Sequence, residues 1–315
     1  MIQNALALPL WRLNIAGLGT AAWRSLVQRR PKPAKVAQKD GPEFSVVVCS
    51  IDNAKLDAVS ANYRRLLDGH SHEIVAIRDA RSLAEGYNRG IARARGKYLI
   101  LSHDDIEILT PDFARRVAAH LESFDVIGIA GTTRVVGGAW FLAGHPYDYQ
   151  LVVSPTGRAG RFVIIVRGSG PLVVPSVQAI DGVFMAMRAE VAREVQFDPV
   201  TFDHFHLYDI DFSFRAYLRG YRLAVCRDIF LFHDSLGHFD AVWEEYRQRF
   251  ESKFAASLPA QGPLVEAPVL RFEIDASMQR DEAQLRWLCD PVNLAGLLAR
   301  LPSPERKHGS ATAGG

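Results

Sequence analysis

The amino-acid sequence predicts an α/β protein with a mainly parallel central sheet flanked by helices. Its 315 residues are enough for one large α/β domain or two small ones. With 48% hydrophobic and 23% charged residues, the composition is that of a globular protein with a sizeable core. Between residues 44 and 130, short apolar runs alternate with segments of helical periodicity, the order that gives parallel sheets.

The first half of the chain contains the alternating elements. Residues 44–49 form a β-branched apolar run typical of a buried strand, and residues 82–95 carry apolar side chains at helical spacing until Gly96. The same patterns predict strands at 44–49, 72–77, 98–101 and 126–130, and helices at 56–67, 82–95 and 111–123.

The second half of the chain has a different composition. Residues 131–178 are rich in Gly, Pro and Val, which predicts loops and a small antiparallel excursion, where specificity elements usually lie. A strand is expected across 177–188. The remaining patterns predict helices at 211–218, at 240–254 and within 279–301, and short strands at 223–225 and 229–232.

Four regions are expected along the chain. An N-terminal helix and basic linker (1–41) precede a folded domain (42–258), whose nucleotide-binding half (about 42–130) comes before an acceptor half (about 131–258). A C-terminal extension (259–301) follows, and a low-complexity tail (302–315) is expected to be disordered.

Positive charge is concentrated at the N-terminus. Residues 1–39 hold seven Lys or Arg and no Asp or Glu, so the remaining 30 basic and 35 acidic residues give −5, and nucleic acid is not an expected partner. Apolar residues between Trp11 and Leu26 follow helical spacing, but the uncharged run 13–23 is too short to span a bilayer. The segment is either an amphipathic anchor on an anionic membrane or a helix packed on its own domain or on a partner.

The three cysteines form no CxxC, which argues against a disulfide framework or a structural zinc site. A reducing compartment fits best. We therefore expect a cytoplasmic protein, with a peripheral contact on the inner face of the membrane if residues 1–39 bind lipid.

Two adjacent carboxylates, Asp104 and Asp105, follow the expected strand at 98–101. Ligands of parallel α/β sheets bind at the carboxyl ends of strands, and neighbouring carboxylates are unfavourable unless a cation or donors compensate them. Oxygen-rich sites suit Mg²⁺ or Mn²⁺, which typically bridge carboxylates to diphosphate oxygens. The alternative is a turn in which Asp105 or Glu107 caps a following helix.

Three more carboxylates are candidates. Either Asp209 or Asp211 can act as a general base that removes a proton from an acceptor hydroxyl. The other can cap the helix and pair with Arg215 at i+4, or both can be caps. Asp181 interrupts an apolar strand, where an unpaired carboxylate is costly, and Gly182 beside it permits close approach by a ligand. The alternative for Asp181 is satisfaction by backbone amides.

His233 follows the expected strand at 229–232. A neutral imidazole at a strand end can ligate a metal, although a lone histidine is more often structural.

Missing motifs exclude other chemistry. No GxGxxG follows Val48, which disfavours a dinucleotide or S-adenosylmethionine site, and neither a P-loop nor a GxSxG elbow exists in the sequence.

In order and spacing, these pieces resemble the family 2-like glycosyltransferases of GT-A fold, and most closely a bacterial subgroup with a His-Asp-Asp metal motif. The resemblance covers about residues 44–240 and implies a single GT-A-type domain. The segments that carry it are SLAEGYNRGI at 82–91, ARGKYL at 94–99, SHDDI at 102–106, IDGVF at 180–184, and YDIDFSFR at 208–215 with Gly220-Tyr221.

The resemblance implies a role for each candidate. Asp104, together with Asp105, would hold a divalent metal, Mn²⁺ or Mg²⁺, on the diphosphate of a nucleotide-sugar donor, for which a UDP-sugar is expected. His233 matches a histidine often found near the metal or diphosphate. Asp209 matches the catalytic base, and Asp181 would contact the acceptor. The residues expected around the donor nucleotide are Ser50, Asp79, Asn88, Ser102 and His103.

The sequence also departs from the family pattern. Ser102 replaces the first Asp of the usual Asp-x-Asp, which makes Asp104 the expected metal ligand and leaves Asp105 as a second ligand or helix cap. Tyr208 replaces the Glu that usually precedes the base, and Ile51-Asp52-Asn53 replaces the usual acidic residue and Asn. The implied reaction is an inverting displacement onto a glycan, a lipid-linked acceptor or another hydroxyl compound.

Two other functions compete with this interpretation. A sugar nucleotidyltransferase would need a Gly-rich phosphate loop with a basic residue after the first strand, which residues 50–53 do not offer. A non-catalytic binding module of the same fold would have no need for Asp104, Asp181 and Asp209 together.

Overall fold

The computed structural model describes residues 41–235, 237, 239–259, 269–275, 287 and 290–299. The expected N-terminal helix and linker, apart from Gly41, and the tail 302–315 lie outside the described residues, as does the membrane contact expected of 1–39. Within the described ranges, no helix has the length and apolar character needed to cross a membrane.

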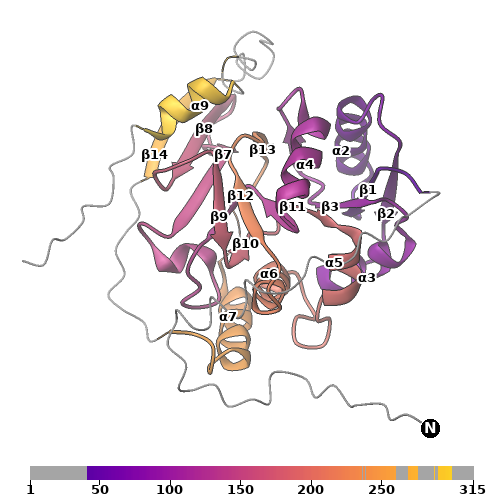
Figure 1. Cartoon of the computed structure of the whole chain (residues 1–315), viewed down its shortest axis with the longest axis vertical. Helices are drawn as coiled ribbons and strands as arrows, with labels where there is room; N and C mark the ends of the chain where they lie inside the picture. The colour runs from indigo at the N-terminus through magenta and orange to yellow at the C-terminus, as the bar shows by residue number, and fades with distance from the viewer. Residues whose placement is uncertain are drawn as a thin grey trace, which may run out of the picture.

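The central sheet has seven strands in the order β2-β1-β3-β11-β5-β12-β9 (Figure 1). Its strands are β1 (Phe44–Cys49), β2 (His72–Ile77), β3 (Tyr98–Ser102), β5 (Val126–Gly128), β9 (Val173–Val177), β11 (Phe184–Arg188) and β12 (Leu223–Cys226). β1 pairs in parallel with β2 and β3, and β12 pairs in parallel with β5. β11 is antiparallel to both β3 and β5, and β9 is antiparallel to β12. The expected α/β class, a central sheet flanked by helices, is confirmed, but the sheet is mixed, because three of its six strand pairings are parallel and three are antiparallel.

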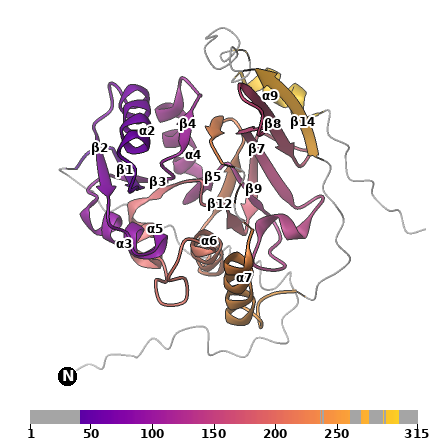
Figure 2. The same cartoon turned by 180° about the vertical axis from the view of Figure 1, so that it is seen from behind.

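Helices cover both faces of this sheet (Figures 1 and 2). They are α2 (Asn53–Leu66), α3 (Leu83–Arg93), α4 (Phe113–Ser123), α5 (Ala189–Val195), α6 (Tyr208–Leu218) and α7 (Ala241–Lys253). Because successive strand residues point to opposite faces, Val47 of β1 packs with the α3, α5 and α6 side, whereas Val46 and Val48 pack with α2 and α4. A Cβ at Gly90 would lie 2.1 Å from Val47, so this glycine allows α3 to pack directly on β1.

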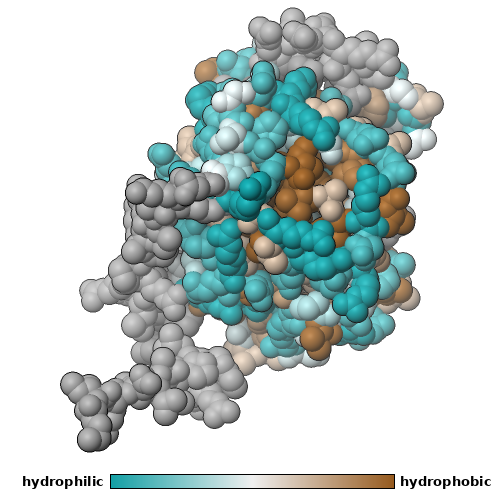
Figure 3. All heavy atoms as spheres, turned by 90° about the vertical axis from the view of Figure 1, so that its right-hand side faces the viewer, coloured by the Kyte–Doolittle hydropathy of each residue, from teal (hydrophilic) through white to brown (hydrophobic). Residues whose placement is uncertain are grey.

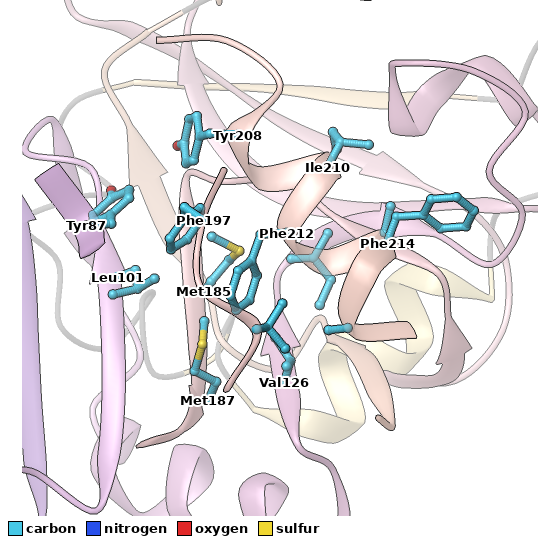
Figure 4. Packing of buried hydrophobic residues seen from close by; sticks show 14 of the residues in the cluster. Tyr87, Leu101, Val126, Met185, Met187, Phe197, Tyr208, Ile210, Phe212 and Phe214 are labelled. Carbon is cyan, nitrogen blue, oxygen red and sulfur yellow. The ribbon is translucent and has the colours of Figure 1, made fainter. Parts of the chain in front are cut away.

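Figure 4 shows the core on the α3 and α6 side of the sheet. Tyr87 of α3, Leu101 of β3, Met185 and Met187 of β11, and Phe212 of α6 are all fully buried in one cluster. This packing holds the start of α6 against the strand ends, and the start of α6 carries two of the predicted site residues.

A second sheet lies beside the first, with the order β10-β6-β7-β13-β4. Its strands are β4 (Ile106–Ile108), β6 (Ala130–Thr132), β7 (Asp148–Pro155), β10 (Ala179–Ile180) and β13 (Leu231–His233); β8 (Arg161–Arg167) extends it from β7, and β14 (Val269–Asp275) pairs with β8. The 3₁₀-helix η2 (Trp140–Ala143) connects β6 to β7, and α9 (Pro291–Leu298) packs Leu294 and Leu298 against β7 and β8 residues. The antiparallel excursion expected at 131–178 is therefore part of a complete sheet, and β14 was not expected.

Three element predictions were wrong. The strand expected across 177–188 is broken into β10 and β11, which belong to different sheets, and the strand expected at 126–130 is likewise divided between β5 and β6. No helix follows Asp105, since β4 begins at Ile106, so the helix-cap alternative for Asp105 is wrong. An apolar run that passes from one buried sheet into another has the same pattern as a single buried strand.

The edge of the central sheet lies at β2, which pairs only with β1 within the described part of the chain. Figure 3 views the molecule from the right-hand side of Figure 1, where β2 lies, and shows mostly hydrophilic residues around a smaller apolar area. Charged residues such as Glu73 on an edge strand disfavour pairing with another chain.

Candidate active site

The candidate site lies where β3 ends and the chain crosses between the two sheets. Residues 103–105 lead directly from β3 into β4. Ile106 of β4 pairs with His233 of β13, and the backbone N–H of Asp234 donates to the carbonyl of Asp105 (2.9 Å). This strand pairing brings His233 beside the end of β3 although the two segments are distant in sequence.

Three side chains, His103, Asp105 and His233, converge at this point. Oδ1 of Asp105 lies 3.4 Å from Nε2 of His233 and 3.8 Å from Nδ1 of His103. One ligand atom from each residue lies within 4.8 Å of the other two. Oδ1 of Asp105 and Nε2 of His233 are buried and have no hydrogen-bond partner in the described part of the chain. Ligand atoms that share one divalent cation stand roughly 3 to 4 Å apart, so these three groups fit a metal ion.

The electrostatics of the cluster also suit a cation. Burial by itself raises the pKa of Asp105, but the polar interaction with the His233 imidazole 3.4 Å away, followed by that with His103, outweighs it and lowers the pKa to about 2. Burial and the charge of His233 lower the pKa of His103. At neutral pH the cluster therefore offers a carboxylate together with the neutral imidazole of His103, the form in which histidine ligates metals.

Tyr208 orients His103. The hydroxyl of Tyr208 lies 2.9 Å from Nε2 of His103 and donates to the carbonyl of Gly182 (3.4 Å). This arrangement assigns the proton of His103 to Nε2, which donates to the tyrosine oxygen, and leaves the lone pair on Nδ1 facing Asp105. Leu207, just before Tyr208, has φ of 59°, a left-handed conformation that is unfavourable for leucine and is held by burial.

Of the two adjacent carboxylates, Asp105 and not Asp104 lies beside both histidines, which favours Asp105 as the first metal ligand. Asp105 joins the two histidines, whereas the side chain of Asp104 makes no hydrogen bond or ion pair among the residues that the structure describes. Burial raises the pKa of the Cys49 thiol to about 12, and the charge of Asp104 adds to this effect, which places Asp104 near the end of β1. The charges of both carboxylates also act on His103, so the two lie around the same imidazole, with Asp105 beside His233 and Asp104 toward the end of β1.

Asp181 and Asp209 meet at Gly182, in the crossing between β10 and β11. The backbone N–H of Gly182 donates to Oδ2 of Asp209 (2.6 Å). A Cβ at this position would lie 2.2 Å from the Tyr208 hydroxyl and 2.8 Å from Cβ of Asp209. The close approach that Gly182 allows is therefore by the first turn of α6, and the expectation of an approach by a ligand is corrected.

Burial of Asp209 and the neighbouring charge of Asp181 together make Asp209 basic. Asp181 accepts hydrogen bonds from Nε1 of Trp140 (2.7 Å) and from the backbone N–H of Val183 (2.9 Å). Burial, and next to it the charge of Asp181, raises the pKa of Asp209 to about 7, against the opposing effect of backbone N–H groups. A carboxylate whose pKa lies near neutral pH is suited to general-base catalysis.

Asp211 forms a structural ion pair. Its side chain is fully buried, Oδ2 accepts from Nε of Arg215 (2.8 Å) and Oδ1 accepts from Nζ of Lys253 (2.6 Å). The i+4 pair expected with Arg215 is confirmed. One oxygen is bound by Arg215 one turn along α6 and the other by Lys253 of α7, so in this structure Asp211 is not placed to take a proton from a substrate, which favours Asp209 as the base.

Two residues expected at the donor nucleotide, Asn88 and Ser102, form hydrogen bonds with the backbone of the domain. The side-chain amide of Asn88 exchanges two hydrogen bonds with the backbone of Phe197 (3.0 and 2.9 Å). Ser102 is fully buried, and its Oγ donates to the carbonyl of His103 (2.8 Å). Because this hydroxyl is buried and bonded within the chain, Ser102 is not accessible to a donor nucleotide in this structure, and His103 lies with Asp105 and His233.

The other two residues expected at the nucleotide lie beyond the ends of β1 and β2. Oγ of Ser50 donates to the carbonyl of Asp52 (2.9 Å), and Asp52 caps α2 by accepting from the backbone N–H of Lys55 (3.1 Å). Asp79 has 78% of its side chain exposed and pairs with Arg89 (2.9 Å). Both residues are near the carboxyl edge of the sheet.

Sequence reasoning missed two contributors to the site. Tyr208, which orients His103, was noted only as a departure from the family's Glu. Trp140, which holds Asp181, lies in a Gly-rich segment without periodicity, and no sequence signal distinguishes it from a core tryptophan.

Comparison with known proteins identifies the family. Residues 45–254, well over half of the chain, match the model of the Glycosyltransferase like family. A Fuscovulum blasticum protein described as ATP synthase subunits region ORF 6 is 26% identical over 246 residues, 74% of this chain and 92% of its own length.

Two solved structures are similar to this chain at low sequence identity. S. aureus TarS 1-349 is 13% identical with a TM-score of 0.38, over 68% of this chain and 72% of that one. The mannosyltransferase PcManGT from Pyrobaculum calidifontis, solved in complex with GDP-Man and Mn²⁺, is 13% identical with a TM-score of 0.41, over 90% and 83% of the two chains. On the family match, this chain belongs to the Glycosyltransferase like family and is a glycosyltransferase.

Proposed function

We propose that this enzyme transfers a sugar from a nucleotide-diphosphate sugar to an acceptor hydroxyl, with Asp209 as general base and a divalent metal at His103, Asp105 and His233. One observation carries the proposal: two histidines and a carboxylate converge beside a second carboxylate whose pKa is raised to about 7. A metal cluster next to a base is the arrangement that a metal-dependent displacement at a diphosphate ester requires.

The ligand set favours Mn²⁺ over Mg²⁺. Two of the three groups are imidazoles, which suit transition metals, whereas Mg²⁺ prefers oxygen ligands and retains its water. When bound, the metal supplies charge stabilisation to the departing nucleoside diphosphate. Tyr208 supports the site by fixing the tautomer of His103.

In this proposal Asp209 and Asp181 act on the acceptor. Asp209 removes the proton of the attacking hydroxyl, and the negative charge of Asp181 together with burial makes Asp209 basic enough for this step. Asp181 is itself held by Trp140 and Val183, so it stays in place as an acceptor contact. A single in-line displacement from this arrangement inverts the anomeric centre.

The donor nucleotide is assigned to the carboxyl ends of β1 and β2, near Ser50 and Asp79. Asp104 lies on that side without an intramolecular partner among the described residues, which leaves its oxygens for the ribose hydroxyls. A UDP-sugar is the first donor to test. Contact of residues 1–39 with an anionic membrane, and a cytoplasmic location, stay predictions.

The test is release of nucleoside diphosphate from a panel of UDP- and GDP-sugars by the full-length protein, after chelation and on addition of Mn²⁺ or Mg²⁺. We expect chelation to abolish hydrolysis and Mn²⁺ to restore more of it than Mg²⁺. We expect Asp105→Asn to raise the Mn²⁺ concentration that gives half-maximal hydrolysis. Asp104→Asn should weaken binding of the donor and leave that Mn²⁺ concentration unchanged. The exposed control Asp57→Asn should change neither quantity.

Other results would contradict the proposal. Full activity in chelator removes the metal role. Formation of a nucleotide sugar from a sugar phosphate and a nucleoside triphosphate would identify a nucleotidyltransferase, and binding of nucleotide sugars without turnover would identify a binding module.

A further inference from the structure

A row of aromatic side chains extends from Asp181 to the protein surface. Trp140 donates its indole N–H to Asp181 and stands edge-on to Phe141, with ring centroids 5.6 Å apart. Phe141 in turn stands edge-on to Phe239 (5.6 Å), and Phe239 stands edge-on to Trp243 of α7 (5.2 Å). We call Trp140, Phe141, Phe239 and Trp243 the aromatic row.

The outer part of the row is exposed yet fixed in orientation. Phe239 is 60% exposed, whereas Trp140 at the inner end is only 7% exposed. The ring of Phe239 meets Phe141 at 89° and Trp243 at 83°, and two such edge-to-face contacts hold it from both sides. A single exposed apolar residue needs no explanation, but this one continues a chain of contacts that begins at the candidate acceptor carboxylate.

The charges beside the row indicate what kind of ligand it can bind. Among the described residues, Asp240 caps α7 immediately after Phe239, and both arginines of α7 are paired, Arg247 with Glu244 (2.6 Å) and Arg249 with Glu245 (2.6 Å). Arg167, whose guanidinium lies 5.8 Å from the centre of the Trp140 ring, pairs with Asp148 (3.3 Å). An acidic and charge-paired surface of this kind does not attract an anionic membrane or nucleic acid. It suits an uncharged ligand with apolar faces and hydroxyl groups.

We propose that the acceptor is a carbohydrate, one of whose sugar rings stacks on Phe239 while the hydroxyl to be glycosylated lies at Asp181 and Asp209. The C–H faces of a pyranose ring pack on aromatic rings, and its hydroxyls bind carboxylates. This inference rests on the proposed function and deepens it by naming the acceptor class.

The reaction on such an acceptor balances. The hydroxyl oxygen attacks the anomeric carbon of the donor sugar and forms the new glycosidic C–O bond. The hydroxyl proton passes to Asp209. The bond from the anomeric carbon to the diphosphate oxygen breaks, and the nucleoside diphosphate leaves with the electron pair.

The experiment titrates the full-length protein, without donor, with short uncharged oligosaccharides of glucose, mannose, galactose and N-acetylglucosamine, and follows tryptophan fluorescence. We expect at least one of them to bind, and Phe239→Ala to weaken that binding about three- to tenfold, the range of a lost aromatic contact. Phe239→Trp retains the binding. Val200→Ala, an exposed apolar residue outside the row, changes nothing.

Three results would overturn the proposal. The first is that no oligosaccharide binds, or that Phe239→Ala binds as tightly as the wild type. The second is that Phe239→Ala leaves sugars unaffected but abolishes co-sedimentation with phosphatidylglycerol vesicles, which would make the row a membrane contact. The third is that the variant shifts a monomer–dimer equilibrium, which would make it an interface between copies of the chain.

Hydrolysis of nucleotide sugars with Mn²⁺ separates this proposal from the proposed function. Hydrolysis by wild type and Phe239→Ala alike, with no oligosaccharide binding, overturns only the carbohydrate acceptor. Oligosaccharide binding that depends on Phe239, with no hydrolysis of any donor, overturns the transfer activity and leaves the aromatic row as a carbohydrate site.

Discussion

Replacing Asp209 by Asn tests the assignment of the base, because it should affect activity and stability in opposite directions. Asn keeps the shape of the carboxylate and can still accept the hydrogen bond from Gly182, but it cannot take a proton. We expect donor binding to persist and transfer to fall by about 10²- to 10⁴-fold, the usual contribution of a general base.

The expected gain in stability follows from the pKa of Asp209. Its pKa is raised from 3.8 to about 7, a difference of about three pKa units. Because the folded state binds this proton more tightly than the unfolded state, the group's stabilising contribution is complete below about pH 4 and is lost as the pH rises through 7. At roughly 1.4 kcal/mol per pKa unit the loss is at most about 4 kcal/mol. Because Asp209 is partly exposed, solvent screens the interaction, and we expect about half of that loss, about 2 kcal/mol.

The assay is urea denaturation of the metal-free wild type and Asp209→Asn at pH 4 and at pH 8, with release of nucleoside diphosphate measured in parallel with metal present. The free energy of unfolding of the variant should equal that of the wild type at pH 4 and exceed it by about 2 kcal/mol at pH 8, because Asn imitates the protonated acid. If the two proteins have the same free energy of unfolding at pH 8, or differ by the same amount at both pH values, the electrostatic reasoning is refuted. Unchanged turnover would move the base to Asp181.

Three further predictions follow from the contacts around α6. Gly182→Ala should lower the free energy of unfolding by about 1 to 3 kcal/mol in urea denaturation, because its Cβ collides with Tyr208, whereas the control Gly296→Ala has open space; equal stability of the two variants would contradict the close approach. Asp211→Asn should lower the free energy of unfolding by about 3 to 5 kcal/mol in the same assay, because it removes the charge of a fully buried carboxylate that binds Arg215 and Lys253; a variant that folds normally but does not turn over would restore Asp211 as the base. Tyr208→Phe should weaken binding of Mn²⁺ about 10- to 100-fold, measured by titrating the hydrolysis rate with Mn²⁺, and saturating Mn²⁺ should restore the rate. An unchanged affinity for Mn²⁺ would show that Tyr208 does not support His103.

Local patterns were enough to predict the framework of the domain. The apolar run at 44–49, the helical spacing after Ser82 and the alternation of strands and helices predicted the parallel part of the sheet, since each depends on neighbours within a few residues. Asp211 pairs with Arg215 one turn away, as the i+4 spacing predicts, and Ser82, expected inside the helix, caps α3 by accepting from the backbone N–H of Glu85.

Long-range pairing decided the site. The sequence by itself determined that carboxylates and a histidine stand at strand ends, but not which of them meet. Only the antiparallel register of β13 on β4 brings His233 to Asp105, and it does so while Asp104 lies on the side of β1. A shift of one residue at a strand end changes which side chain faces the site. The residue pattern within one strand does not indicate which other strand pairs with it.

The same reason explains the crossing at Asp181. Two short strands that belong to different sheets read in sequence as one apolar strand, so the break that exposes Asp181 to Trp140 and sets Gly182 against Asp209 was decided only by the tertiary structure. Local chemistry determined the fold class and the candidate residue types. The packing of two sheets against each other decided the geometry that joins them into a site.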